Sequence, residues 1–260
     1  MVRPSHLNRE NADAFADEEV ARSYRYRPAY PPDTIDFLAG LVKGTPRRVL
    51  DLGCGTGFIA RPITAFVDHV DAVDASSAML AEARRQPGGD DRRIHWIASR
   101  AEAMPVEGPY GLITAGESLH WMDWPVVLPR CVELLAPGGS LAIARIDTVP
   151  TRWEEELQEV IASHSVVKDY HRFDMIAALE QAKLFQRTGE FESQVVRREE
   201  SVAEFIESFH ARSSLTRSRL GPEAAASFDR EIEYLVARYE GDSIVREIRA
   251  TVVYGTPGRG

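Results

Sequence analysis

The chain is 260 residues long, with 44% hydrophobic residues, 27% charged residues and a formal net charge of -9 at pH 7. This composition predicts one folded domain with an insertion and excludes an intrinsically disordered chain. We do not expect nucleic acid as a partner, because the chain is acidic overall and has no dense run of Lys or Arg that would attract phosphates.

No segment reaches the roughly 18 uncharged apolar residues that span a bilayer, and the N-terminus, MVRPSHLNRENADAF, lacks the apolar run of a signal peptide. We therefore expect a cytoplasmic protein without a membrane partner. The two cysteines, Cys54 and Cys131, lie too far apart in sequence to indicate a disulfide framework. No Cys/His spacing typical of zinc is present, so we expect no metal site.

Residues 1–46 predict a leader helix, a loop bounded by two prolines and a first helix. Short apolar runs then alternate with helical patterns as far as residue 146, and the pattern becomes mainly helical in 147–184. The predicted strands are 49–52, 70–74, 94–99, 110–116, 141–146, 192–199 and 244–254, and the predicted helices are 76–85, 124–136, 153–167, 173–184, 202–209 and 222–239.

Seven strands that mostly alternate with helices predict an α/β fold with a doubly wound, mostly parallel sheet and right-handed crossovers. Residues 1–46 then form N-terminal helices over a main domain of residues 47–260. Residues 147–184 form a helical insertion after the fifth strand. The turn Pro-Gly-Gly at 137–139 is expected to stop the preceding helix before that strand begins.

Three glycines at alternate positions, Gly53, Gly55 and Gly57, directly follow the first predicted strand. Glycine lets a ligand approach the main chain without meeting a Cβ, although such a loop also serves as a plain structural turn. A dinucleotide-binding loop would carry its third glycine one place later, where this chain has Phe58. A triphosphate-binding loop would need Gly-Lys-Ser/Thr, which is absent.

Asp74 ends the second predicted strand, seventeen residues after Gly57. At the carboxyl ends of parallel strands, its carboxylate can accept hydrogen bonds from both ribose hydroxyls of an adenosyl cofactor. The alternative is that Asp74 caps the next helix, but Ser76 is the better capping residue. Asp51 lies just ahead of the glycines, so the loop suits a cofactor that carries an amino-acid moiety and no pyrophosphate.

The segment 51–57, Asp-Leu-Gly-Cys-Gly-Thr-Gly, resembles the first motif of the class I S-adenosylmethionine-dependent methyltransferases. Segments 73–80 and 98–105 resemble the second and third motifs of that family, and 134–139 resembles the turn before its fifth strand. The resemblance implies a Rossmann-like methyltransferase fold with its last strand antiparallel, S-adenosylmethionine as cofactor and S-adenosylhomocysteine as product. The cofactor-binding residues it implies are Asp51, Gly53, Cys54, Gly55, Gly57, Asp74, Ala75, Met79, Ala101, Glu102, Ala115 and Gly116.

Two further segments resemble the trans-aconitate methyltransferase-like branch, which acts on small molecules. They are 26–31, Tyr-Arg-Pro-Ala-Tyr-Pro, and 118–123, Ser-Leu-His-Trp-Met-Asp. The resemblance favours a lid formed by the N-terminal segment over the cofactor, and an ordinary surface loop is the alternative. The candidate substrate-binding residues are Tyr24, Tyr26, Arg27, Tyr30, His120, Trp121 and Arg145.

His120 follows the fourth predicted strand and is the candidate catalytic residue. An imidazole with an ordinary pKa of about 6.5 is suited to deprotonate a hydroxyl or amine acceptor. The alternative is a histidine that packs beside Trp121 and hydrogen-bonds to the main chain. Arg27 and Arg145 are candidates to hold an anionic acceptor, with a surface ion pair as the alternative for Arg145.

These residues predict methyl transfer to oxygen, nitrogen or carbon of a small-molecule acceptor by in-line displacement, which requires alignment of the nucleophile and exclusion of water. Two other functions are compatible with the pattern: a nicotinamide-dependent oxidoreductase on a similar sheet, and a cofactor-binding protein without transferase activity. The sequence does not select the acceptor, nor does it distinguish a monomer from a homodimer.

Overall fold

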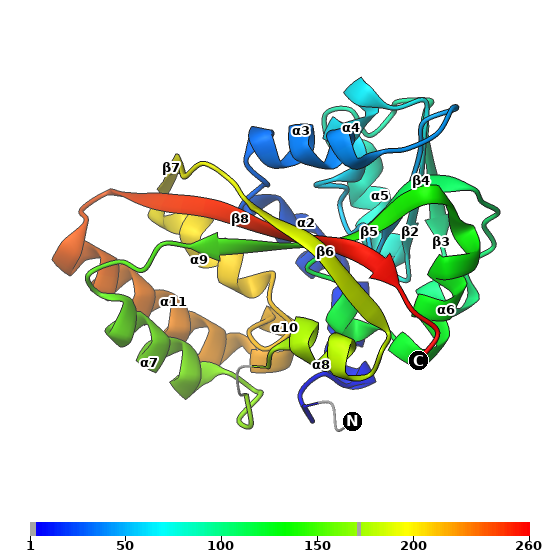
Figure 1. The fold of residues 1–260 in the computed structure, drawn as a ribbon. Coiled ribbons are helices and arrows are strands. Elements are labelled where there is room, and N and C mark those ends of the chain that lie inside the picture. The colour runs from blue at the N-terminus through cyan, green and yellow to red at the C-terminus, as the bar shows by residue number, and fades with distance from the viewer. Residues whose placement is uncertain (1–3, 171–172) are drawn as a thin grey trace.

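A computed structural model describes residues 4–170 and 173–260 of the chain. In these residues eight strands form one sheet in the order β3-β2-β1-β4-β5-β8-β6, with β7 also paired to β8 (Figure 1). The strands are β1 Arg48–Leu52, β2 His69–Asp74, β3 Ile94–Ala98, β4 Tyr110–Gly116, β5 Leu135–Thr148, β6 Phe185–Glu192, β7 Val196–Ser201 and β8 Ser243–Pro257.

The predicted α/β fold is confirmed, because β1 to β5 pair in parallel and the last strand, β8, is antiparallel to β5. The predicted number of seven strands is wrong. The expected strand 192–199 spans a break between β6 and β7, which pair with opposite ends of the long strand β8. Both strands expose much of their surface at the sheet edge, so their polar sequence gave no signal for the break.

The turn predicted at 137–139 does not end before the fifth strand begins. β5 starts at Leu135 and contains the turn as an irregularity, where its register against β4 shifts between Tyr110 and Leu112. Gly138 adopts a φ of 75°, a left-handed conformation that glycine accepts without strain. A glycine turn can therefore lie within a strand as a bulge.

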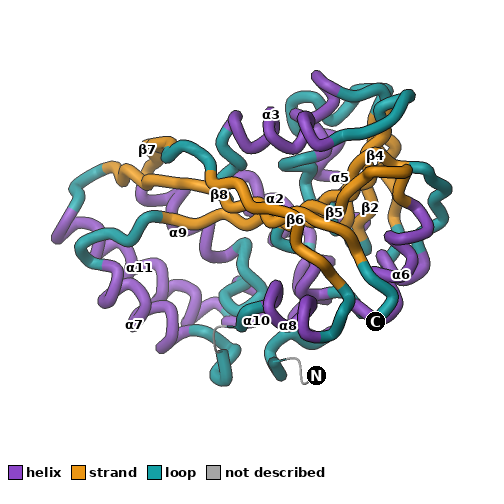
Figure 2. The backbone as a smooth tube through the Cα atoms, viewed as in Figure 1, coloured by secondary structure: helices purple, strands orange, loops and turns teal. Residues whose placement is uncertain are grey.

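Helices cover both faces of the sheet (Figure 2). Successive residues of β1 face opposite layers: Val49 packs in a core with α3 and α4, and Leu50 packs in a core with α6 and α8. The described helices are α1 Arg9–Asp13, α2 Glu18–Ser23, α3 Pro32–Leu41, α4 Ala60–Ile63, α5 Ser77–Arg85, α6 Trp124–Leu134, α7 Glu154–His164, α8 Met175–Gln181, α9 Val202–His210, α10 Arg217–Leu220 and α11 Pro222–Tyr239.

A separate apolar core lies beyond the main sheet and joins α7, α9 and α11 to the start of β8. Its large side chains include Trp153, Phe209 and Phe228, each almost fully buried. The two helices of the predicted insertion 147–184 therefore belong to different cores. α7 packs with helices that come much later in the chain, whereas Leu179 of α8 packs against the main sheet.

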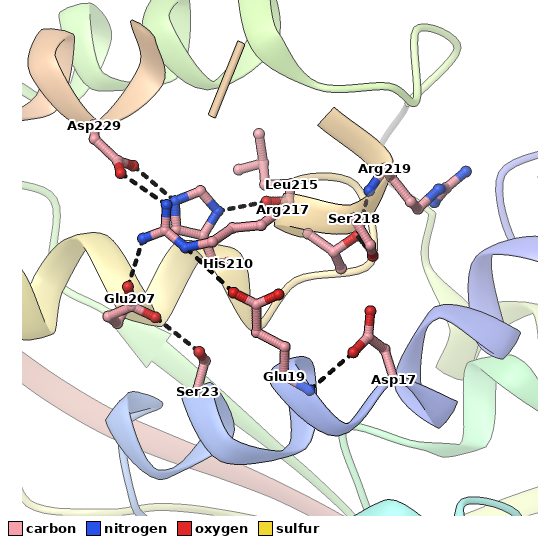
Figure 3. Close-up of polar contacts among 11 residues, drawn as sticks. Asp17, Glu19, Ser23, Glu207, His210, Leu215, Arg217, Ser218, Arg219 and Asp229 are labelled. Carbon is pink, nitrogen blue, oxygen red and sulfur yellow. Dashed lines mark hydrogen bonds and ion pairs between the residues drawn. The ribbon is translucent and has the colours of Figure 1, made fainter. Parts of the chain in front are cut away.

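A partly buried polar cluster links α2 to the second lobe, which is the region formed by α7, α9, α10, α11 and the start of β8 (Figure 3). Arg217 of α10 forms ion pairs with Glu207 of α9 and with Asp229 of α11, the latter at 2.8 Å, and lies 3.7 Å from Glu19 of α2. Ser23 of α2 donates a hydrogen bond to Glu207 at 2.7 Å. One guanidinium thus links three helices of the lobe to the N-terminal segment.

We predict that Arg217→Gln destabilises the protein by about 2 kcal/mol, which lowers Tm by about 4–8 °C, because Glu207 and Asp229 lose hydrogen bonds from a charged donor. Thermal unfolding at pH 7 measures this. The control Arg197→Gln breaks an ion pair whose arginine is 76% exposed and should change Tm by at most about 1 °C. Equal effects of the two variants would contradict the linking role.

The effect of Arg217→Gln should also depend on pH. Burial acts to raise the pKa of Glu207, but hydrogen bonds from Arg217 and Ser23 outweigh it and hold that pKa below its ordinary value of 4.5. A depressed carboxyl pKa stabilises the fold above pH 4.5, and this stabilisation is lost as pH falls through the folded-state pKa. The difference between wild type and variant should therefore shrink towards pH 4, as measured by denaturant unfolding at each pH.

Candidate functional site

The glycine loop follows β1 at the carboxyl edge of the sheet. Gly53, Gly55 and Gly57 all have positive φ, at 64°, 52° and 82°, so each takes a conformation that other residues rarely adopt. A Cβ on Gly57 would lie 2.6 Å from the Trp96 ring, whereas a Cβ on Gly55 would meet only Tyr24, at 3.7 Å. Gly57 is therefore required for packing, and Gly55 leaves its main chain open to a cavity.

Asp74 joins the glycine loop to the next strand and helix. The main-chain N–H of Gly55 donates to Asp74 Oδ2 at 2.8 Å, and the N–H of Ser76 donates to Asp74 Oδ1 at 2.8 Å. The Ser76 hydroxyl accepts a hydrogen bond from the Met79 N–H, so Ser76 caps α5 as predicted. The carboxylate and the loop thus converge on one place, as an adenosyl-binding site requires.

A cavity of about 940 Å³, including its open mouth, lies at this edge of the sheet and is called the larger cavity. The N-terminal segment forms one of its walls: Phe15 lines it and lies edge-on to Trp121 at 5.8 Å. The predicted cofactor-binding residues that line it are Gly53, Gly55, Asp74, Ala75, Met79, Ala101, Glu102 and Gly116.

A second cavity of about 770 Å³, the smaller cavity, adjoins the first. Tyr24, Glu117, Gly53, Gly55 and Gly116 line both cavities and so form their boundary. The predicted substrate-binding residues that line the smaller cavity are Tyr24, Arg27 and Tyr30. The predicted cofactor-binding residues Asp51 and Cys54 lie in this cavity and do not line the larger one.

Five predicted site residues line neither cavity. They are Gly57, Ala115, Tyr26, His120 and Arg145. Ala115 is fully buried in β4. The His120 ring packs beside Trp121 with centroids 4.8 Å apart, and Arg145 forms an exposed ion pair with Asp147 at 3.1 Å. The ring contact is the packing part of the alternative stated for His120, and the ion pair is the alternative stated for Arg145.

Several lining residues were missed from the sequence. Glu117 directly follows β4, adopts a φ of 51°, and accepts a hydrogen bond from the Ile146 N–H at 2.7 Å. Its place at the carboxyl end of a strand is a signal that could have found it. Arg212 follows α9 and Arg246 lies in β8, and no motif marks either residue.

Three carboxyl groups gather around the boundary of the two cavities, and burial raises the pKa of each. The pKa of Asp51 is raised to about 7, despite a hydrogen bond from Thr114 Oγ1 at 2.8 Å. Burial likewise raises the pKa of Asp74 and of Glu117 above their ordinary values. A cationic ligand at this boundary would favour the ionised carboxylates and be held by them.

Comparison with known proteins agrees with this geometry. Fold and site together define an α/β protein with a cavity at the carboxyl ends of parallel strands. Residues 49–139 match the family model described as a methyltransferase domain. The matched segment contains the glycine loop and Asp74, and the match agrees with the resemblance of these motifs to the class I S-adenosylmethionine-dependent methyltransferases.

The chain is 38% identical over 153 residues to a trans-aconitate 2-methyltransferase of Methylobacterium radiotolerans, with 57% of each protein covered. It is 29% identical over 162 residues to a ubiquinone biosynthesis O-methyltransferase of Nitrobacter winogradskyi, covering 60% of this chain and 59% of that one. The chain thus aligns with little more than half the length of these curated relatives.

A solved structure from Anaeromyxobacter dehalogenans, described as a type II methyltransferase, superposes with a TM-score of 0.63. The match covers 88% of this chain and 97% of that one at 19% identity, so it supports the fold alone.

None of the helices in residues 4–170 and 173–260 has the length and apolar character needed to cross a bilayer. Within the same ranges, no group of three or more His, Cys, Asp or Glu side chains is placed to hold a metal ion.

We predict that Asp51→Asn flattens the dependence of stability on pH between about 4 and 7. Since the folded-state pKa of Asp51 lies at about 7, above its ordinary 3.8, the folded protein binds the extra proton in this interval and loses stability as pH rises. The variant should be more stable than wild type above pH 7, on the order of 2–4 kcal/mol. Denaturant unfolding at steps of pH measures the slope. Asp90→Asn, at an exposed carboxyl, is the control, and an unchanged slope in Asp51→Asn contradicts the assignment.

Proposed function

We propose that this chain transfers a methyl group from S-adenosylmethionine to a small-molecule acceptor. The observation that carries the proposal is the contact between Asp74 and the Gly55 N–H at the wall of the larger cavity. It unites the two motifs that an adenosyl cofactor needs, and it lies within the segment that matches the methyltransferase family. The cytoplasm is the proposed location.

The residues around the larger cavity fit the cofactor. Each Asp74 oxygen accepts one main-chain N–H and retains a lone pair for a ribose hydroxyl. Met79 and Ala101 are almost fully buried and offer apolar walls for an adenine ring, with Glu102 beside them. When bound, S-adenosylmethionine supplies a methyl group activated by a sulfonium centre.

The boundary between the cavities is suited to hold a cation and to face an acceptor. Asp51 and Glu117 would hold the positive charge of the amino-acid part of the cofactor. Burial raises the pKa of both carboxyl groups, and a neighbouring cation would favour their ionised forms. Tyr24 lines both cavities and would exclude water from the boundary. Alignment of this kind lowers the activation free energy by about 7–11 kcal/mol.

The smaller cavity is the proposed acceptor site. Tyr30 lines this cavity and packs against the end of β4. A Cβ atom added to Gly116 would lie 2.6 Å from the Tyr30 hydroxyl, so only glycine leaves room for the ring. His120 lies outside both linings. Glu117 lines both cavities and is the candidate general base in this proposal. The acceptor atom, whether oxygen, nitrogen or carbon, is left open by these residues.

Neither alternative function is favoured by a specific contact. Phe58 occupies the place of the third glycine of a dinucleotide loop, and its side chain lines the smaller cavity. A cofactor-binding protein without transferase activity would share the larger cavity but would have no use for a second one beside it. We therefore retain methyl transfer as the proposal.

We predict that S-adenosylhomocysteine stabilises the protein by about 2.7 kcal/mol at a hundredfold excess over its Kd, whereas NADH does not. Asp74→Ala should weaken binding of S-adenosylhomocysteine at least tenfold, because it removes the proposed partner of the ribose hydroxyls. Isothermal titration of wild type, Asp74→Ala and the surface control Asp90→Ala measures the affinities. Tight NADH binding, or an affinity unchanged in Asp74→Ala, would refute the assignment.

Cofactor binding should also release protons. A cation beside Asp51 and Glu117 lowers their raised pKa values, so the folded protein gives up to about one proton near pH 6.5 and almost none at pH 8.5. Titration calorimetry with S-adenosylhomocysteine in two buffers of different ionisation enthalpy counts the protons. Asp51→Asn should reduce the count. Proton uptake on binding would show that the ligand's cation lies elsewhere.

A further inference from the structure

Three guanidinium groups from distant parts of the chain meet in the smaller cavity. Arg27 precedes α3, Arg212 follows α9, and Arg246 lies in β8. Arg246 is neutralised within the fold, because it donates to the buried carboxylate of Glu200 at 2.7 Å. Within residues 4–170 and 173–260, neither Arg27 nor Arg212 forms a direct ion pair of this kind, although the charge of Arg27 acts on Glu117 in the same lining.

Arg212 is the most unusual of the three. Its Nε is buried without a hydrogen-bond partner, and its guanidinium lies 4.5 Å from the centre of the Phe209 ring. In residues 4–170 and 173–260, the ion pairs within 4.0 Å include neither Arg212 nor Arg27. Burial, followed by the charges of Arg27 and Arg246, lowers the pKa of Arg212 to about 9, which leaves it protonated at neutral pH.

A buried cation without a counter-ion opposes folding, since its desolvation is not offset by an anion. Arg212 does not fasten elements of the fold together as Arg217 does, because it forms no direct ion pair among the described residues. Its guanidinium packs on an aromatic ring, and the repulsion from Arg27 and Arg246 acts on its pKa more strongly than the attraction of Glu154. An anion that enters the smaller cavity would supply the missing partner. The guanidinium group is well matched to such a ligand because its donors form a planar fork.

We propose that Arg27 and Arg212 form an oxyanion subsite, so that the methyl acceptor is a small molecule carrying a carboxylate or phosphate group. This inference rests on the proposed function, since it defines the substrate class of the same site. Arg212 lines the smaller cavity alone, whereas Tyr24 and Glu117 line both cavities. The oxyanion is therefore held away from the cofactor, and the rest of the acceptor extends towards the boundary.

The test is isothermal titration of the full chain with succinate, its uncharged analogue succinamide, and inorganic phosphate, each with and without saturating S-adenosylhomocysteine. We expect succinate or phosphate to bind saturably and succinamide not to bind. The stronger of the two anions identifies the group as carboxylate or phosphate. Arg212→Gln should weaken anion binding at least tenfold, and Arg212→Lys, which keeps the charge, should weaken it less.

The matched control is Arg197→Gln, at an arginine whose side chain is 76% exposed and paired with Glu247. It should change anion affinity by less than twofold. Thermal unfolding of the ligand-free variants tests a purely structural role: Arg212→Gln should retain or raise Tm, because it removes an unpaired buried charge. A large fall in Tm together with unchanged anion affinity would overturn the proposal.

The two proposals fail separately. If S-adenosylhomocysteine binds but neither anion does, or if anion affinity is the same in wild type and Arg212→Gln, the oxyanion subsite is refuted and the proposed transferase function stands. If an anion binds through Arg212 but S-adenosylhomocysteine does not bind, the subsite is supported and the proposed function is refuted.

Discussion

The carboxylate of Asp74 accepts hydrogen bonds from the Gly55 and Ser76 main-chain N–H groups, and the geometry of the whole site depends on this contact. It fixes the glycine loop after β1 against the end of β2 and the start of α5. The loop itself is unusual backbone, with positive φ at three glycines, and it holds that conformation because its neighbours constrain it. Without the carboxylate, the open main chain at Gly55 would have no fixed position relative to the rest of the larger cavity.

Carboxyl groups and arginine side chains occupy different parts of the site. Three carboxyl groups with raised pKa values, Asp51, Asp74 and Glu117, surround the boundary of the two cavities. Arginine side chains lie in the smaller cavity beyond it. Under the proposals made above, a cationic donor and an anionic acceptor would each find the complementary charge, and the same fields would orient them towards one another.

The site is assembled from parts of the chain with separate roles. The segment 49–139 that matches the methyltransferase family contains the glycine loop, Asp74 and Glu102. Arg27, Arg212 and Arg246 lie outside it, in the N-terminal segment and the second lobe. Arg217 joins those two regions, so the walls of the smaller cavity are held in place by contacts remote from the larger cavity. This division fits the general rule that a shared fold carries the cofactor while variable elements choose the substrate.

The sequence by itself determined the α/β fold, the glycine loop, the acidic residue that meets it and the Ser76 cap, because each depends on neighbours within a few residues or on a short strand–turn–helix unit. It did not show that β6 and β7 are separate strands, since the break depends on their pairing with opposite ends of β8. Nor did it reveal Arg212 and Arg246, or that His120 packs beside Trp121 outside the lining of both cavities. The two arginines share a cavity with Arg27, which lies nearly two hundred positions or more away in sequence, so only the packing of α9, β8 and the N-terminal segment against one another decided their place.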